Sequence, residues 1–126
     1  TGTEADVHTA VNALTSGGMT NLYEGINLAK GELNDTHLPD ERPAVPDVMI
    51  IVTDGNPNQP PDEAAARAAA LAEANAARAA GIQVFVVGIG SDVDATYLQT
   101  IADPGKYFPA DFVTLQTTLL NLVSCN

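Results

Sequence analysis

The chain has 126 residues, of which 16 are acidic and only 5 are basic, so its formal net charge is −11. This length suits one domain with one hydrophobic core, and the apolar content of 45% is ordinary for a globular protein. The charge argues strongly against nucleic-acid binding, which needs clustered lysine and arginine, and against docking to anionic membranes. No apolar run is long enough to span a bilayer, so we expect no direct membrane insertion.

The first half of the chain predicts two helices, a loop and a buried strand. Residues 5–16 carry apolar side chains at helical spacing, and a second helix is expected over Asn21–Leu33. Residues 34–46 contain three prolines and are expected to form a polar loop. The run Val48–Thr53 has no polar break before its last residue, which is typical of a parallel strand covered on both faces.

The second half continues this alternation. Residues 60–63, Pro-Pro-Asp-Glu, favour the first turn of an alanine-rich helix that runs to about Ala80. A second buried strand is expected over Ile82–Gly90. The remaining predicted elements are a helix over about 95–102, a short strand near 106–109 and a last helix over about 112–123. The pattern predicts an α/β fold: a doubly wound, mostly parallel, Rossmann-like sheet with helices on both faces.

Asp54 directly follows the first buried strand and precedes Gly55. A carboxylate at the carboxyl end of a buried parallel strand lies where open α/β sheets bind ligands. The strand alone does not separate this role from that of an aspartate that only shapes a turn or caps a helix. We do not expect an enzyme, because no phosphate-binding glycine-rich loop or nearby lysine accompanies Asp54, and His8 and His37 are isolated.

The predicted sheet lacks a neighbour for its first strand. About three strands are found, against roughly five or six in a typical sheet, and none falls in the first 45 residues. The apolar composition of the strand at Val48–Thr53 is typical of a strand in the middle of a sheet, with a neighbour on each side. Only the strand at Ile82–Gly90 is available to flank it. A long apolar edge would be a template for aggregation. We therefore expect a missing N-terminal segment, or another chain, to complete the sheet.

Two separated segments resemble the von Willebrand factor type A domain family, also called integrin inserted domains. Residues 16–22, SGGMTNL, are similar to the family's glycine-glycine-threonine loop, with Met19 as an insertion, and residues 50–57 are similar to its apolar strand ending in Thr-Asp-Gly. Three further segments match in order and spacing: 81–90, 98–102 and 107–108. The resemblance implies that residues 1–126 form the C-terminal two-thirds of such a domain.

The resemblance also implies a metal-ion-dependent adhesion site on the rim of the sheet. Thr20 would correspond to the threonine of the family's second loop and Asp54 to the aspartate of its third loop. These oxygens suit Mg²⁺, or Mn²⁺ or Ca²⁺, and an open coordination position would accept a carboxylate from a protein ligand. Asn56 and Asn58 would shape the ligand-binding rim. Alternatively, Thr20 could cap the helix that begins near Asn21, and Asp54 could hold its own loop.

One departure from the family concerns its first loop, which supplies Asp-x-Ser-x-Ser after the first strand. This chain contains no such sequence, and its nearest acidic cluster, Ser91–Asp94, lacks the serines. The absent motif and the absent neighbouring strand would belong to one N-terminal segment. We therefore expect residues 1–126 alone to bind Mg²⁺ weakly, or not at all, and to associate through the open strand edge.

The sequence thus predicts a divalent-cation-dependent protein-binding, or adhesion, module that is extracellular or at the cell surface. Asn34-Asp35-Thr36 fits a glycosylation acceptor, and the lone Cys125 would need a partner elsewhere if the protein is secreted. In many extracellular members of the resembled family, a cysteine near the C-terminus pairs with one before the first strand. The alternative is an intracellular type A domain that recruits partners within an ATPase or metal-chelatase complex.

Overall fold

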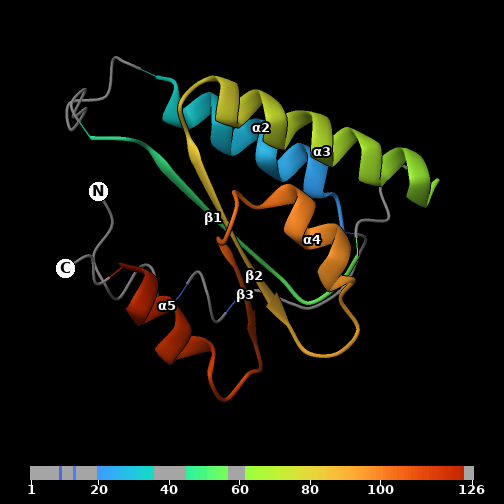
Figure 1. Ribbon diagram of the computed structural model, residues 1–126, viewed down its shortest axis with the longest axis vertical. Helices are drawn as coiled ribbons and strands as arrows, with labels where there is room; N and C mark the ends of the chain where they lie inside the picture. The colour runs from blue at the N-terminus through green and yellow to red at the C-terminus, as the bar shows by residue number, and fades with distance from the viewer. Residues whose placement is uncertain (1–8, 10–12, 14–19, 36–44, 57–61, 124–126) are drawn as a thin grey trace.

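A computed structural model describes residues 9, 13, 20–35, 45–56 and 62–123, and it contains a parallel sheet flanked by helices (Figure 1). The strands, in spatial order, are β1 (Val48–Thr53), β2 (Gln83–Ile89) and β3 (Tyr107–Ala110). The helices are α2 (Leu22–Leu33), α3 (Glu63–Ala79), α4 (Ala95–Ile101) and α5 (Leu115–Val123). The predicted α/β class is confirmed, and most boundaries agree within one or two residues.

The strands of the sheet all run in the same direction. β1 and β2 are parallel, as predicted, with Val48 opposite Gln83 and Thr53 opposite Gly88. β3 pairs in parallel with the other side of β2. The carboxyl ends of the strands therefore meet at one rim. In the part of the chain that the structure describes, no strand flanks β1 on its other side, so this apolar strand is an edge.

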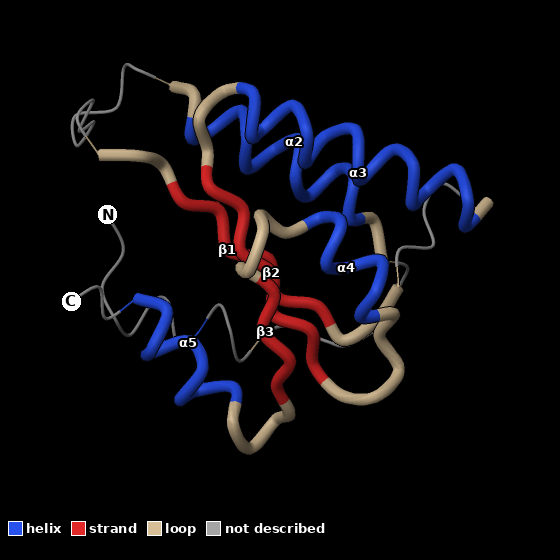
Figure 2. The backbone as a smooth tube through the Cα atoms, in the orientation of Figure 1, coloured by secondary structure: helices blue, strands red, loops and turns tan. Residues whose placement is uncertain are grey.

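Helices cover both faces of the sheet: α2, α3 and α4 lie on one side and α5 on the other (Figure 2). The core lies under the first group. Helix α3 contributes a stripe of small side chains, all with 0% exposure, at spacings of four, four and three residues: Ala66, Ala70, Ala74 and Ala77. The larger fully buried side chains of this core come from α2, β2 and α4: Ile26, Val84, Val86, Leu98 and Ile101. The short alanine side chains allow α3 to pack closely.

The ends of α3 follow from its flanking residues. The Asp62 carboxylate accepts hydrogen bonds from two backbone N–H groups of the first turn, so Asp62 is the N-cap. The helix therefore begins at Glu63, whereas the two prolines had predicted a start at about residue 60. After the helix, Gly81 has a φ of +89°, a left-handed conformation that glycine adopts without strain.

Helix α5 begins later than its apolar periodicity predicts, at Leu115 instead of about Phe112. The Asp111 carboxylate accepts hydrogen bonds from the N–H groups of Val113 and Thr114, which holds this segment in a turn ahead of the helix. As a result, Phe112 and Val113 are 77% and 89% exposed and do not join the core.

Several predictions concern residues that the structure does not describe. Of the helix expected over residues 5–16, only Thr9 and Ala13 are described, and a backbone hydrogen bond of 3.1 Å joins them across one helical turn. Most of the loop expected over residues 34–46 also lies outside the described residues, together with His8, His37, Asn58 and Cys125. Among the described helices, none is both long and apolar enough to cross a membrane.

Candidate functional site

Asp54 lies at the rim, on the first residue after β1, with its side chain exposed. The turn that presents it is held by its neighbour, because the buried Thr53 hydroxyl donates to the carbonyl of Gly55 at 2.9 Å and accepts from the Gly55 N–H at 3.3 Å. The Asp54 carboxylate makes no hydrogen bond or ion pair with any residue that the structure describes. It caps no described helix, since Asp62 caps α3. Its charge is therefore directed to solvent at the rim.

Thr20 lies beside this turn, at the start of α2. A Cβ atom placed on Gly55 would be 3.8 Å from the Thr20 hydroxyl oxygen, which is ordinary contact distance. Thr20 does not cap the helix that follows it. That role belongs to Asn21, whose Oδ1 accepts the N–H of Glu24 at 3.1 Å. The structure thus brings the Thr20 hydroxyl against the turn that carries Asp54.

A mostly apolar hollow of about 310 Å³ extends from this point along the open side of β1. It lies between α2 and the strand, and its lining includes Thr20, Leu22, Ile26, Met49, Ile51 and Thr53. Val48 and Val52 of the same strand are 46% and 44% exposed, and Val52 also lines the hollow. In the part of the chain that the structure describes, the edge of β1 therefore offers both unpaired backbone groups and uncovered apolar side chains.

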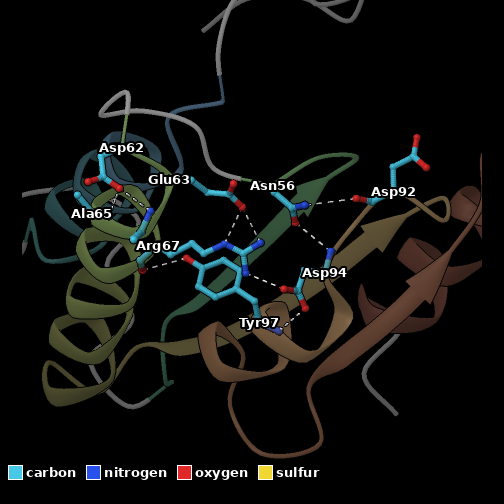
Figure 3. A network of polar contacts seen from close by, with 9 residues as sticks. Asn56, Asp62, Glu63, Ala65, Arg67, Asp92, Asp94 and Tyr97 are labelled. Atoms are coloured by element: carbon cyan, nitrogen blue, oxygen red, sulfur yellow. Dashed lines mark hydrogen bonds and ion pairs between the residues drawn. The ribbon is translucent and has the colours of Figure 1, made fainter.

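Asn56 joins the β1 loop to the loop between β2 and α4. Its Oδ1 accepts the backbone N–H of Asp94 at 2.9 Å, and its Nδ2 donates to the carbonyl of Asp92 at 3.4 Å (Figure 3). Both polar ends of the Asn56 side chain are therefore engaged by protein. Asn58, the second residue predicted to shape the rim, lies outside the described residues.

Asp94 is in turn held by Arg67 of α3. One guanidinium nitrogen of Arg67 lies 2.6 Å from the Asp94 carboxylate, and Nε donates to Glu63 at 3.0 Å. The guanidinium also lies over the ring of Tyr97, 4.6 Å from its centroid, and the Tyr97 hydroxyl donates to the Arg67 carbonyl at 3.1 Å. Asp94 caps α4 by accepting the N–H of Tyr97 at 3.0 Å. This network fixes the start of α4 against α3.

The network shifts the ionisation of its members. The hydrogen bond from Arg67, followed by the Tyr97 backbone hydrogen bond, lowers the pKa of Asp94 below its ordinary value. The Asp94 hydrogen bond in turn raises the pKa of Arg67. Burial raises the pKa of Tyr97 to about 12. At neutral pH the acid and the base are thus fully charged, and the tyrosine keeps its proton for hydrogen bonding.

Sequence reasoning did not identify Arg67, Asp94 or Tyr97 as members of the rim. The one signal available was the spacing of Glu63 and Arg67, which is four residues and favours an ion pair on a helix surface. Nothing local indicated that the same arginine also reaches a residue 27 positions further along the chain.

Comparison with known proteins identifies relatives of this fold. A sequence model of the von Willebrand factor type A domain matches residues 1–121. Matrilin-4 of Mus musculus is 37% identical over 97 residues, which cover 75% of this chain and 14% of that protein. Matrilin-1 of Homo sapiens is 30% identical over 94 residues, or 75% of this chain and 17% of that protein. The chain therefore spans less than a fifth of these curated relatives.

Solved structures are similar as well. Proximal thread matrix protein 1 from the mussel byssus, solved with a zinc-occupied MIDAS motif, matches with a TM-score of 0.69 and 25% identity, over 96% of this chain and 30% of that chain. The manganese-loaded TRAP protein of Plasmodium vivax matches with a TM-score of 0.66 and 23% identity, over 91% of this chain and 44% of that chain. The second likeness supports the fold alone.

Proposed function

We propose that this chain, which belongs to the von Willebrand factor type A domain family, is a protein-binding module that recognises its ligand through a divalent cation at the rim. Thr20 and Asp54 would hold the ion. The observation that carries the proposal is their adjacency: the Thr20 hydroxyl lies beside the turn on which Asp54 exposes a carboxylate unpaired among the described residues.

The chemistry of these donors suits a hard divalent ion. Mg²⁺ prefers carboxylate and hydroxyl oxygens and retains several waters, so an exposed aspartate beside a threonine is a suitable partial ligand set. It is only partial, because no group of three or more His, Cys, Asp or Glu side chains converges within the described residues. We therefore propose that an upstream segment pairs one of its strands with the open edge of β1 and supplies the remaining oxygens from an Asp-x-Ser-x-Ser sequence that follows that strand.

Two features of β1 support this completion. A hollow of about 310 Å³ lies along the strand between its open side and α2. The side chains of Val48 and Val52 are nearly half exposed, although such residues in a parallel strand are normally covered. An added strand would satisfy the free backbone groups of β1, and the layer that accompanies it would bury these valines.

The bound ion would supply an electrophilic position that accepts a carboxylate from the protein partner. This accounts for how a chain with a net charge of −11 can recognise an acidic group. Without a cation, the carboxylates of Asp54 and of the ligand would repel each other. A divalent cation between them would attract both carboxylates. The mussel byssus neighbour, solved with zinc at its MIDAS motif, supports a metal at this rim. Being a thread matrix protein, it also supports an extracellular setting.

The test is calorimetric titration of Mg²⁺ and Mn²⁺ into a protein that contains both this chain and the proposed upstream segment. Asp54→Asn should weaken binding at least about tenfold, because it removes a charged ligand. The matched control is Asp47→Asn, the same substitution just before the amino end of β1, which should leave affinity unchanged. Equal affinities of the Asp54 variant and the unsubstituted protein would refute the site.

The role of the strand edge is tested separately on residues 1–126 alone. We expect weak Mg²⁺ binding, together with an increase in mass by light scattering as copies pair through β1. With the upstream segment present, the mass should be that of a monomer. Tight Mg²⁺ binding by a monomer of residues 1–126 would show that no added strand is needed.

A further inference from the structure

The side chain of Asn56 connects the described part of the loop that carries Asp54 to another part of the rim. Thr53 shapes the turn itself through its side-chain hydrogen bonds with Gly55, two residues away. Beyond it, Asn56 reaches across to a loop 36 to 38 positions further along the chain. Within the described residues of the loop, this is the longest-range attachment.

The anchor at the far end of this attachment is rigid. Asp94 offers its backbone N–H to Asn56 while its carboxylate is held by the Arg67 guanidinium at 2.6 Å and by the N–H of Tyr97 at 3.0 Å. Asp94 is only about a third exposed, and Arg67 is a quarter exposed. The Asp94 N–H that donates to the Asn56 Oδ1 is therefore held in place by contacts with α3 and α4 and by the chain that leaves β2.

We infer that Asn56 is a positioning residue that fixes the Asp54 turn against the start of α4. The inference rests on the function proposed above, in which Asp54 is a cation ligand. The oxygen and the nitrogen of the Asn56 side chain each make a hydrogen bond to the loop that ends at Asp94, so this side chain links the two loops. Asn56 would thus shape the rim, as the sequence predicts, by pre-organising the turn that carries Asp54.

The consequence for cation binding is energetic as well as geometric. A cation that binds a mobile carboxylate must first restrict its motion, and this entropic cost lowers affinity. Because Asn56 already restricts the turn in the folded protein, this entropy is lost on folding and does not lower the affinity for the cation. Replacing Asn56 by alanine should therefore weaken cation binding about tenfold, the factor that corresponds to a lost hydrogen bond of about 1.4 kcal/mol.

The first measurement uses metal-free protein and nitrogen-15 relaxation. In the unsubstituted protein, the backbone amides of Asp54 and Gly55 should have order parameters near the rigid value of about 0.85, and Asn56→Ala should lower them toward about 0.6. The conservative variant Asn56→Asp retains an acceptor for the Asp94 N–H, so it should keep the turn ordered. This measurement needs no bound ion, so it tests the inference whether or not the proposed function holds.

The second measurement is Mn²⁺ affinity in a protein that also contains the proposed upstream segment. The matched control is Lys30→Met, which removes the ion pair with Glu73 that joins α2 to α3 away from the rim. This control should lower the melting temperature without changing affinity, whereas Asn56→Ala should change affinity. Unchanged order at Asp54 and Gly55 in Asn56→Ala would overturn the inference. Absence of cation binding in the unsubstituted protein would overturn the proposed function and leave the relaxation result to decide the role of Asn56.

Discussion

Replacing Gly88 with alanine should destabilise the protein, because the backbone of β2 passes close to two side chains at this residue. A Cβ atom on Gly88 would lie 2.7 Å from the Tyr107 hydroxyl oxygen and 3.2 Å from a Leu98 methyl carbon. Leu98 is fully buried and has little room to move. Gly88 lies opposite Thr53, the residue that shapes the Asp54 turn, so the strain would arise directly beneath the rim.

The magnitude follows from two opposing effects. Overpacking of a filled site costs about 1–3 kcal/mol. Removing a glycine from a strand returns about 0.5–1 kcal/mol, because the unfolded chain loses conformational freedom. We therefore expect Gly88→Ala to lower the free energy of unfolding by about 1–2 kcal/mol. With a urea m-value of about 1–3 kcal/mol/M, the midpoint should fall by about 1 M.

Gly31→Ala is the matched control. Gly31 lies in α2, and a Cβ atom added there would meet nothing within 4 Å, so the same chemical change should raise stability by about 0.5–1 kcal/mol. Urea unfolding of both variants at low protein concentration measures the difference. In a Tyr107→Leu background, Gly88→Ala should cost less than half as much. If Gly88→Ala is neutral while Gly31→Ala behaves as expected, close packing at Gly88 is refuted.

Three further predictions concern stability. The pKa of Asp94 is lowered below its usual 3.8 in the folded state. The stabilisation from its ionised carboxylate is therefore complete above about pH 3.8 and is lost as the pH falls through the lower pKa of the folded state. Asp94→Asn should reduce this loss of stability at low pH, as measured by thermal unfolding at several pH values. Arg78 donates to the Asp103 carboxylate and to carbonyls at the end of α4, so Arg78→Ala should cost about 2 kcal/mol and Arg78→Lys, which lacks the planar fork, should recover less than half of it in urea unfolding. Ala74→Leu should cost about 1–3 kcal/mol, because Ala74 is fully buried, whereas Ala76→Leu on the exposed side of the same helix should stay within about 0.5 kcal/mol in the same assay.

Local sequence signals were sufficient for most of the fold. β1 has the predicted bounds Val48–Thr53, because an uninterrupted apolar run followed by glycine leaves few alternatives. The predicted start of α5, at about Phe112, was wrong because apolar periodicity alone counts Val113 as helical. A side chain bonded to its own backbone overrides periodicity, and Asp111 makes such bonds immediately before the helix.

The site was predictable only in part. The unbroken apolar strand before it marked Asp54 as a rim residue. Thr20 was linked to Asp54 only through family resemblance, since contacts between separate loops leave no local sequence signal. Asn56 was assigned to the ligand-binding rim because it lies in the loop directly after Asp54 and Gly55. Its two hydrogen bonds to the Asp92–Asp94 loop depend on the tertiary fold, as does the ion pair of Arg67 with Asp94.

The alanine stripe of α3 also bears on how the protein reaches its native state. Alanine is the strongest helix former, and α3 has 17 residues, more than the roughly 12–15 below which isolated helices are marginal in water. Helix α3 connects β1 to β2 along the chain. At a rise of about 1.5 Å per residue, the helix is far shorter than the same residues in an extended conformation. A helix that forms early reduces the entropy lost when the two strands meet. By this reasoning, the residues that permit close packing in the finished core also favour formation of α3 before the sheet.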